Sequence, residues 1–387
     1  PMPVRASASP GNARNPDKIL AYHMEKVFIV SSPGLVPFTI QELQHLNLLT
    51  EQTSCMNIEA GGIEFRGSIE DIYRTNLLLR TASRVLLRMG EFHAATFPEL
   101  RKHVQQLPWE RFVNPGQGVA MRVTCHKSRL YHSAAVAREV IASINSRLGK
   151  PVQLLKFDEE QDRIAPQLLI VRLVNDQCTL SIDTTGPLLH RRGYRLETAK
   201  APLRETLAAG IILASGWDGT SPLLDPFCGS GTIAIEAALI ACRIAPGSSR
   251  KFAFMDWPTY APDLWTKILT AHTKLANTSA NRSATCPPIL ASDRDAGAIA
   301  IAQANAERAG VGQFIEFSQR AISAIEPAGV GWVVTNPPYG KRVNANKDLR
   351  NLYAQFGNVL RHKCPGWHLA ILCSDLSLLH QLQLTLD

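Results

Sequence analysis

The stretch LLDPFCGSGTIAIEAA, residues 223–238, decides the fold of this chain. An apolar strand ends at Asp225, a loop with Gly229 and Gly231 follows, and a helical pattern begins directly after it. Glycine has no Cβ, so the backbone of this loop can come close to a ligand, and the helix start offers it free N–H groups. Strand, glycine-rich loop and helix in this order predict a nucleotide-type ligand at the edge of a parallel sheet.

Later stretches repeat the alternation of apolar strand and helical pattern. They are PPILASDRDAGAIAIAQANAERAG (287–310), QFIEFSQ (313–319), GWVVTNPPYG (331–340) and WHLAILCSD (367–375). The alternation predicts a doubly wound parallel α/β sheet that begins near residue 190. Ligands of such sheets bind at the C-terminal ends of the strands, so we expect the polar residues that end these strands to lie together.

The front half of the chain has shorter strands and helices. Their pattern predicts two small α+β units, at about 26–90 and 91–186. In the second unit, QLLIVRLVNDQCTLSID (167–183) predicts two strands joined by a tight turn at Asn175 and Asp176.

A basic loop in the second unit precedes a helix. Lys127 and Arg129 lie in the loop, and the helix opens near His132 and Ser133. Cationic side chains and free helical N–H groups at one place predict a phosphate site. A solvated loop with a serine cap explains the same residues equally well.

The composition narrows the class of protein. The chain has 387 residues, of which 45% are hydrophobic and 19% charged, as in globular proteins of two or three domains. No apolar run approaches the roughly 20 residues that cross a bilayer, and the net charge of +8 favours a polyanionic partner. Eight scattered cysteines without a CxxC pair argue against a metal site and favour reduced thiols in the cytoplasm. Residues 1–25, rich in Pro, Ser, Ala and Arg, predict a disordered leader.

The glycine-rich loop allows two kinds of ligand. It matches the dinucleotide fingerprint loosely, but that site needs an acid about 20 positions later, and the next strand-ending acid, Asp293, comes much later. Asp225 beside the loop suits a cationic ligand better than a pyrophosphate. We therefore expect the amino-acid end of S-adenosylmethionine at the loop and its ribose at Asp293, with Asp295 as the second choice. Each aspartate alone is equally consistent with a helix cap or a surface charge.

A rigid polar segment ends the strand of GWVVTNPPYG. Asn336 offers an amide oxygen, and Pro337 offers a carbonyl whose direction Pro338 helps to fix. Two converging acceptors would hold both hydrogens of an exocyclic NH₂ group, and Tyr339 offers a face on which a base can stack. Orientation of this weakly nucleophilic amine toward a methyl group would be most of the catalysis. A plain Pro-Pro turn with a core tyrosine is the alternative.

The motifs DPFCGSGTIAIEAA, SDRDAGAIAIAQANAERAG and TNPPYG resemble the UPF0020 group of THUMP-containing class I methyltransferases, which make N2-methylguanine in RNA. GGIEFRGSIEDIYRTNLLLRTASRVLLRMGEF and LHRRGYRLETAKAPLRETLAAGIILASGW are similar to the same group, so the resemblance runs from about residue 26 to the end. It implies a ferredoxin-like segment (26–90), a THUMP RNA-binding domain (91–186) and a Rossmann-like methyltransferase domain (190–387). Bacterial members that modify large-subunit rRNA are the most similar, and members that modify tRNA come second.

The resemblance also implies roles for individual residues. The cofactor would be S-adenosylmethionine, bound by Asp225, Phe227, Gly229, Gly231, Asp293 and Pro202. The guanine would be held by Asn336, Pro337 and Tyr339. RNA phosphates would be contacted by Lys127, Arg129 and His132 and, at the domain junction, by Arg191 and Arg192. A solvated basic linker explains the last two equally well.

Two features depart from the pattern of the group. Its members often have an acid for the adenine amino group after the third strand, whereas EFSQRAISA (316–324) has none, so Gln319 or a backbone group is expected there. The chain ends in LCSDLSLLHQLQLTLD (372–387), where a final hairpin strand is expected. Either the chain is trimmed there or its sheet lacks an edge strand. Residues 243–288 form an insertion between the glycine-rich loop and the strand that ends at Asp293, and the sequence assigns this insertion no chemical role.

These features predict an S-adenosylmethionine-dependent RNA methyltransferase that forms N2-methylguanine, in large-subunit rRNA first and in tRNA second, with no membrane or metal partner. Methylation of adenine N6 in DNA, or of protein glutamine, is an alternative because the same segment holds any planar NH₂ group. A binding module without turnover would fit the missing adenine-side acid. A dinucleotide-dependent oxidoreductase is the remaining alternative, and the position of Asp225 disfavours it.

Overall fold

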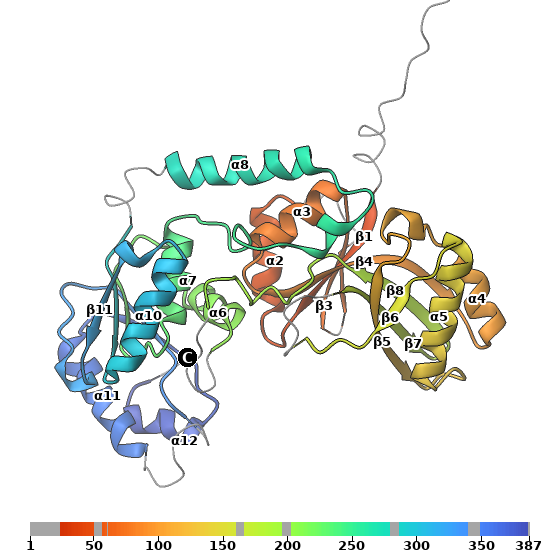
Figure 1. The fold of residues 1–387 in the computed structure, drawn as a ribbon. Coiled ribbons are helices and arrows are strands. Elements are labelled where there is room, and N and C mark those ends of the chain that lie inside the picture. Colours follow the sequence, from red (N-terminus) through yellow and green to blue (C-terminus); the bar gives the residue numbers. More distant parts are fainter. Residues whose placement is uncertain are drawn as a thin grey trace, which may run out of the picture.

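The computed structural model describes residues 24–49, 56–59, 61–159, 166–195, 203–278, 286–339 and 349–385. Two β-sheets with their helices make up the molecule, one in the front half of the chain and one in the rear half (Figure 1).

The front half is built on one sheet of eight strands in the order β2-β3-β1-β4-β8-β7-β5-β6. The strands are β1 (Glu25–Ser31), β2 (Asn57–Glu59), β3 (Gly62–Gly67), β4 (Ala82–His93), β5 (Gly118–His126), β6 (Gln153–Leu155), β7 (Gln167–Val174) and β8 (Gln177–Asp183). The long strand β4 pairs with β1 through its first part and with β8 through its second part. The two α+β units expected from the sequence therefore share a single sheet.

The described helices of the front half are α2 (Val36–His45), α3 (Ile69–Leu78), α4 (Phe97–Gln106) and α5 (Ser133–Leu148). Three of these four, α3, α4 and α5, begin at a residue whose side chain caps them, whereas α2 has no side-chain cap among the described residues. Ser68 and Thr96 each start a capping box, at α3 and α4, in which side chain and backbone exchange hydrogen bonds over three residues. The predicted turn at Asn175 and Asp176 is confirmed, because both residues have positive φ and join the antiparallel strands β7 and β8.

The rear half holds five parallel strands in the order β11-β10-β9-β12-β13. They are β9 (Leu223–Asp225), β10 (Ile289–Asp293), β11 (Ile315–Gln319), β12 (Trp332–Thr335) and β13 (His368–Ile371). The helices between and around them are α6 (Glu205–Ser215), α7 (Thr232–Ala241), α10 (Ala296–Arg308), α11 (Arg350–Lys363) and α12 (Leu376–Leu379). The strand order reverses between β9 and β12, which is the switch point where ligand sites form in such sheets. The predicted doubly wound α/β fold is confirmed.

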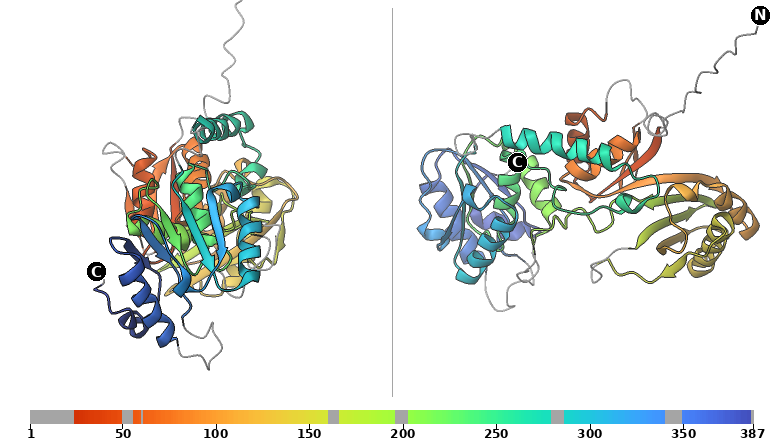
Figure 2. Two further views of the ribbon diagram at one scale, coloured as in Figure 1. Left: turned by 90° about the vertical axis from the view of Figure 1, so that its left-hand side faces the viewer. Right: turned by 45° about the horizontal axis from the view of Figure 1, so that its top comes forward.

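The insertion leaves the rear half after α7 and packs on the front half. It contains η2 (Ala253–Asp256) and α8 (Pro262–Thr278), and α8 lies beside α3 (Figures 1 and 2). Its aromatic side chains are buried in the hydrophobic core of the front half: Phe252, Phe254, Trp257 and Trp265. Trp257 Nε1 also donates to Gln167 Oε1 at 2.8 Å. The role of the insertion is therefore structural, because it fastens the rear half to the front half.

Candidate active site

Three strand ends meet at the C-terminal edge of the five-stranded sheet. Asp225 ends β9, Asp293 ends β10, and Asn336 directly follows β12. β9 pairs with both β10 and β12, and all three strands run parallel. The structure therefore brings these three predicted site residues to one edge.

Asp225 is a buried carboxylate with few partners. It is 1% exposed, and its Oδ1 accepts from the Thr335 hydroxyl at 2.6 Å and from the Phe227 N–H at 3.3 Å. Burial raises the pKa of Asp225 to about 7, although both hydrogen bonds lower it, and the Asp293 carboxylate raises it further. Among the described residues, no cationic side chain contributes to this shift. A cationic ligand at this edge would favour the ionised carboxylate.

The two glycines of the loop serve different purposes. Gly229 has a φ of +50°, and a Cβ added to it would meet no atom within 4 Å, so the loop borders open space there. Gly231 has a φ of +81°, and its Cβ would lie 2.9 Å from the Cβ of Ala302 on α10. Gly229 therefore leaves room for a ligand, whereas Gly231 permits close packing of helix on loop.

Asp293 holds the loop and keeps acceptor capacity. Its Oδ2 accepts from the Gly229 N–H at 3.0 Å, and its Oδ1 accepts from the Asp295 N–H at 3.0 Å. Each carboxylate oxygen can accept more than one hydrogen bond, so a ribose could still bind. Asp295 instead caps α10 by accepting from the Gly297 N–H at 2.8 Å. Gln319 ends β11 opposite Asp293 in the ladder, at the same edge.

The NPPY segment, residues 336–339, carries an unsatisfied acceptor. Asn336 Oδ1 is buried and has no hydrogen-bond partner within the described part of the chain. Pro337 is buried, and Tyr339 is half-buried against the apolar cluster around α11. A buried amide oxygen without a donor costs about 1 to 3 kcal/mol. Asn336 follows Thr335, whose hydroxyl donates to Asp225, so near this carboxylate the Asn336 oxygen is open to a donor beyond the described residues, such as a bound ligand.

Comparison with known proteins assigns this arrangement to a family. The UPF0020 model, described as an RMKL-like methyltransferase domain, matches residues 192–385. The chain belongs to the UPF0020 methyltransferase family. Models of the RlmL ferredoxin-like domain and of the THUMP domain match residues 26–86 and 94–183. The resemblance inferred from the motifs is confirmed.

Similar proteins include curated relatives and solved structures. "Ribosomal RNA large subunit methyltransferase K/L" of Methylococcus capsulatus is 35% identical over 370 residues, which cover 93% of this chain and 48% of that protein. A predicted N6-adenine-specific DNA methylase from Listeria monocytogenes superposes with a TM-score of 0.82 at 32% identity, covering 96% of this chain and 94% of that one. A putative methyltransferase complexed with SAH gives a TM-score of 0.79 at 29% identity, covering 93% and 92%. The UPF0020 chain spans about half the length of the first K/L relatives.

Two residues of this UPF0020 site were missed by the sequence reasoning. Thr335 links Asp225 to the NPPY segment, and the signal was present, because it is a polar residue at the end of an apolar strand. Tyr353 on α11 donates from its hydroxyl to the Pro338 carbonyl at 3.2 Å. No local pattern marked Tyr353, because only the tertiary fold brings α11 to this segment.

The junction arginines require a correction. Arg192 is 3% exposed, and its guanidinium donates to the carbonyls of Leu189 at 2.7 Å and Arg80 at 2.6 Å. It also pairs with Glu236 on α7 at 3.5 Å. The prediction that Arg192 contacts an RNA phosphate is therefore wrong for this structure, because its donors face the protein interior. Arg191 is half-buried, and its RNA contact stays a prediction.

The junction is nevertheless strongly cationic. The pKa of His190 is lowered to about 3, first by burial and then by four nearby arginines. A further positive charge beside these arginines is disfavoured, so His190 stays neutral near pH 7.

The predicted phosphate loop lies in the THUMP unit, which Figure 1 places beyond the ferredoxin-like unit from the five-stranded sheet. Lys127 and Arg129 are exposed. The Arg129 N–H donates to Asp176 Oδ1 at 2.7 Å, so the β7–β8 turn supports the loop. His132 caps α5 through Nδ1, which accepts from the Ala135 N–H at 3.2 Å. These residues and the NPPY segment are not brought together, and their RNA contacts stay predictions.

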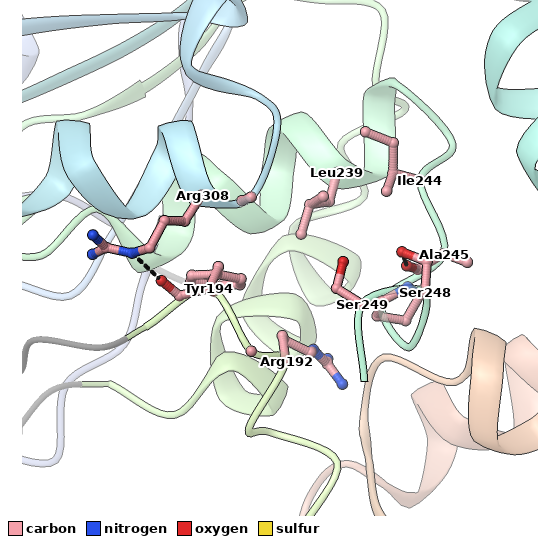
Figure 3. Close-up of a pocket in the computed structure, with 11 residues that line it drawn as sticks. Arg192, Tyr194, Leu239, Ile244, Ala245, Ser248, Ser249 and Arg308 are labelled. Atoms are coloured by element: carbon pink, nitrogen blue, oxygen red, sulfur yellow. Dashed lines mark hydrogen bonds between the residues drawn. The ribbon is translucent and has the colours of Figure 1, made fainter. Parts of the chain in front are cut away.

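A small pocket at the junction is not the ligand site. Figure 3 shows its lining residues, which include Arg192, Tyr194, Leu239, Ser249 and Arg308. Leu239 and Arg308 lie near the C-terminal ends of α7 and α10, and these ends are at the opposite edge of the sheet from Asp225.

The remaining predictions concern Pro202, metal binding and membrane spans. Pro202 lies outside the described residues. Within the described part of the chain, no group of three or more His, Cys, Asp or Glu side chains could hold a metal ion. No helix there is long and apolar enough to span a membrane.

Proposed function

We propose that this chain is an S-adenosylmethionine-dependent RNA methyltransferase that forms N2-methylguanine, in large-subunit rRNA, within the cytoplasm. The observation that carries the proposal is the buried Asn336 Oδ1, which has no donor in the described part of the chain and follows Thr335, the residue that donates to Asp225. The family membership and the name of the Methylococcus relative support it.

The residues present fit the cofactor. Gly229 borders open space, Asp225 has no cationic partner among the residues that the structure describes, and Asp293 can accept further hydrogen bonds. These are the features that a cationic amino-acid group and a ribose require, and a similar solved protein holds SAH. When bound, S-adenosylmethionine supplies an electrophilic methyl group on its sulfonium.

The NPPY segment orients the acceptor amine. Asn336 Oδ1 accepts one hydrogen of the guanine exocyclic NH₂ group, and the Pro337 carbonyl accepts the other. Tyr339 stacks on the base once it has left its helix, a contact worth about 1 to 3 kcal/mol. Because both hydrogens are held, the nitrogen lone pair faces the cofactor, and positioning rather than acid–base chemistry supplies most of the catalysis. The proton lost after transfer passes to water.

RNA is the favoured substrate class because of the front half. A THUMP domain occupies residues 94–183 of it, and exposed cations such as Lys127 and Arg129 lie on the surface of that domain. Arginine and lysine contacts to phosphates give affinity without fixing sequence. We propose that the front half binds the RNA backbone while the NPPY segment receives one unstacked base.

N6-adenine methylation is the second candidate, since the similar Listeria protein carries that name and the NPPY segment accepts any planar NH₂ group.

A labelling experiment distinguishes the two candidates. The full chain is incubated with tritiated S-adenosylmethionine and separate pools of large-subunit rRNA, tRNA, DNA and protein. Label in rRNA that co-elutes with N2-methylguanosine after nuclease digestion supports the proposal. Label in N6-methyladenine supports the second candidate, and cofactor binding without any label overturns both.

A matched pair of variants tests the role of the NPPY segment. Asn336→Ala should abolish transfer and leave the affinity for S-adenosylmethionine, measured by calorimetry, nearly unchanged. Asn358→Ala, on the exposed face of α11, should match the wild type in both measurements. An equal loss of transfer and cofactor affinity in Asn336→Ala would show that Asn336 binds cofactor rather than base.

A further inference from the structure

α11 stands behind the NPPY segment and contacts it through a buried hydroxyl. Tyr353 is 1% exposed, and its OH donates to the Pro338 carbonyl at 3.2 Å. The same oxygen lies 3.4 Å from the Sγ of Cys373, in the segment that follows β13. With the hydroxyl hydrogen directed to Pro338, the Tyr353 oxygen is left as an acceptor for the Cys373 thiol, which also lies 3.5 Å from the Asp375 carbonyl. Tyr353 therefore connects the NPPY segment to α11 and to the segment that follows β13.

The same face of α11 also supports the cofactor loop. Phe356 lies one turn after Tyr353, is fully buried, and meets the Phe227 ring edge-on, with centroids 5.2 Å apart. Phe227 follows Asp225 by two residues, and its N–H donates to that carboxylate. One helix face therefore contacts both parts of the candidate active site.

The NPPY segment needs such a contact more than an ordinary loop does. Pro337 and Pro338 have no N–H, so neither can be held by backbone donation. A hydrogen bond to a carbonyl can fix a peptide plane in this segment, as packing and the proline rings also do. The Pro338 carbonyl belongs to the peptide plane that leads into Tyr339, so its direction helps to set where the Tyr339 ring lies relative to Asn336.

We propose that Tyr353 is a positioning residue for methyl transfer, acting through the Pro338 carbonyl on the NPPY segment. The inference rests on the proposed function, because it assigns Tyr353 a part in the same reaction. Tyr353 touches neither base nor cofactor in this account. It holds the two acceptors and the stacking ring in one arrangement before the base arrives, so the base does not have to order them.

The test compares Tyr353→Phe with Tyr73→Phe. The first variant keeps the ring and removes the hydroxyl that holds Pro338. The second removes an equally buried hydroxyl in the front half, which accepts from the Ala261 N–H at 3.1 Å. In single-turnover reactions at saturating RNA and cofactor, Tyr353→Phe should slow transfer about tenfold, with unchanged affinity for S-adenosylmethionine. Tyr73→Phe should transfer at the wild-type rate.

Amide hydrogen exchange gives a reading that does not depend on activity. Peptides that cover residues 332–339 should exchange faster in Tyr353→Phe than in the wild type, and unchanged in Tyr73→Phe. Wild-type transfer rate or wild-type exchange in Tyr353→Phe overturns this inference alone, provided the wild type labels RNA. A wild type that labels no nucleic acid overturns the proposed function, and this inference with it.

Discussion

Asp225→Asn should stabilise the ligand-free protein while weakening cofactor binding. The pKa of Asp225 is about 7 against an ordinary 3.8, because the carboxylate is buried. That difference corresponds to about 4 kcal/mol. The folded state holds the proton more tightly than the unfolded state, so this cost is absent below pH 3.8, grows as the pH rises, and is complete above pH 7. Asparagine keeps an acceptor for the Thr335 hydroxyl and removes the charge.

The assay is urea unfolding of the ligand-free chain at pH 8 and at pH 5. We expect Asp225→Asn to raise the free energy of unfolding by up to about 4 kcal/mol at pH 8 and by less than half of that at pH 5. Asp263→Asn, which removes an exposed carboxylate at the start of α8, serves as the control and should change little at either pH. A variant that is no more stable than the wild type at pH 8 refutes the claim that burial of the ionised Asp225 carboxylate destabilises the folded protein.

Asp225→Asn should lower the affinity for the cofactor although it raises the free energy of unfolding. If the ionised carboxylate binds the cationic amino-acid group, the wild-type affinity for S-adenosylmethionine rises about tenfold between pH 6 and pH 8, as a group with a pKa near 7 ionises. Asp225→Asn should bind more weakly at pH 8 and lose this part of the pH dependence. An affinity in calorimetry that is unchanged by the substitution refutes the role of Asp225 in binding.

Other substitutions separate ligand contacts from packing. Gly229→Ala should fold with a strained φ of +50° and bind cofactor about tenfold more weakly in calorimetry, because its Cβ enters the open space of the loop. Gly231→Ala should first lower the melting temperature, because its Cβ lies 2.9 Å from another side chain. Lys127→Ala and Arg129→Ala should each reduce the slope of log affinity against log salt for RNA by about 1; an unchanged slope places RNA elsewhere. Trp265→Ala should lower the free energy of unfolding in urea by about 3 to 5 kcal/mol, because the side chain is 8% exposed in the front core.

The site at the strand ends could be predicted because it depends on local patterns and one topological rule. Asp225, Asp293 and Asn336 each follow a short apolar strand, and parallel strands bring such positions to one edge. The loop glycines were equally visible in the sequence, but their different roles were not, because the packing of Gly231 against Ala302 depends on the tertiary fold. The contact between Tyr353 and Pro338 could not be predicted. It depends on how α11 packs, and no local sequence pattern gives the packing direction of that helix.

The domain junction shows why the prediction of an RNA contact for Arg192 failed. An arginine pair between two domains was interpreted as cationic surface, yet Arg192 meets a carbonyl 112 residues earlier and a glutamate 44 residues later. Side chains that far apart in sequence carry no shared pattern. The insertion was opaque for the same reason, because its tryptophans complete the core of another part of the chain.

α7 joins the two functional parts of the molecule. It begins at the glycine-rich loop and carries Glu236, which is fully buried. Glu236 accepts from the Tyr194 hydroxyl at 3.1 Å and pairs with Arg192, so the helix that presents the cofactor loop is also a wall of the domain junction. A buried pair of this kind contributes orientation more than stability, because its desolvation offsets much of its attraction. If RNA binds the front half as proposed, we expect the orientation held at this junction to help select the nucleotide that reaches Asn336.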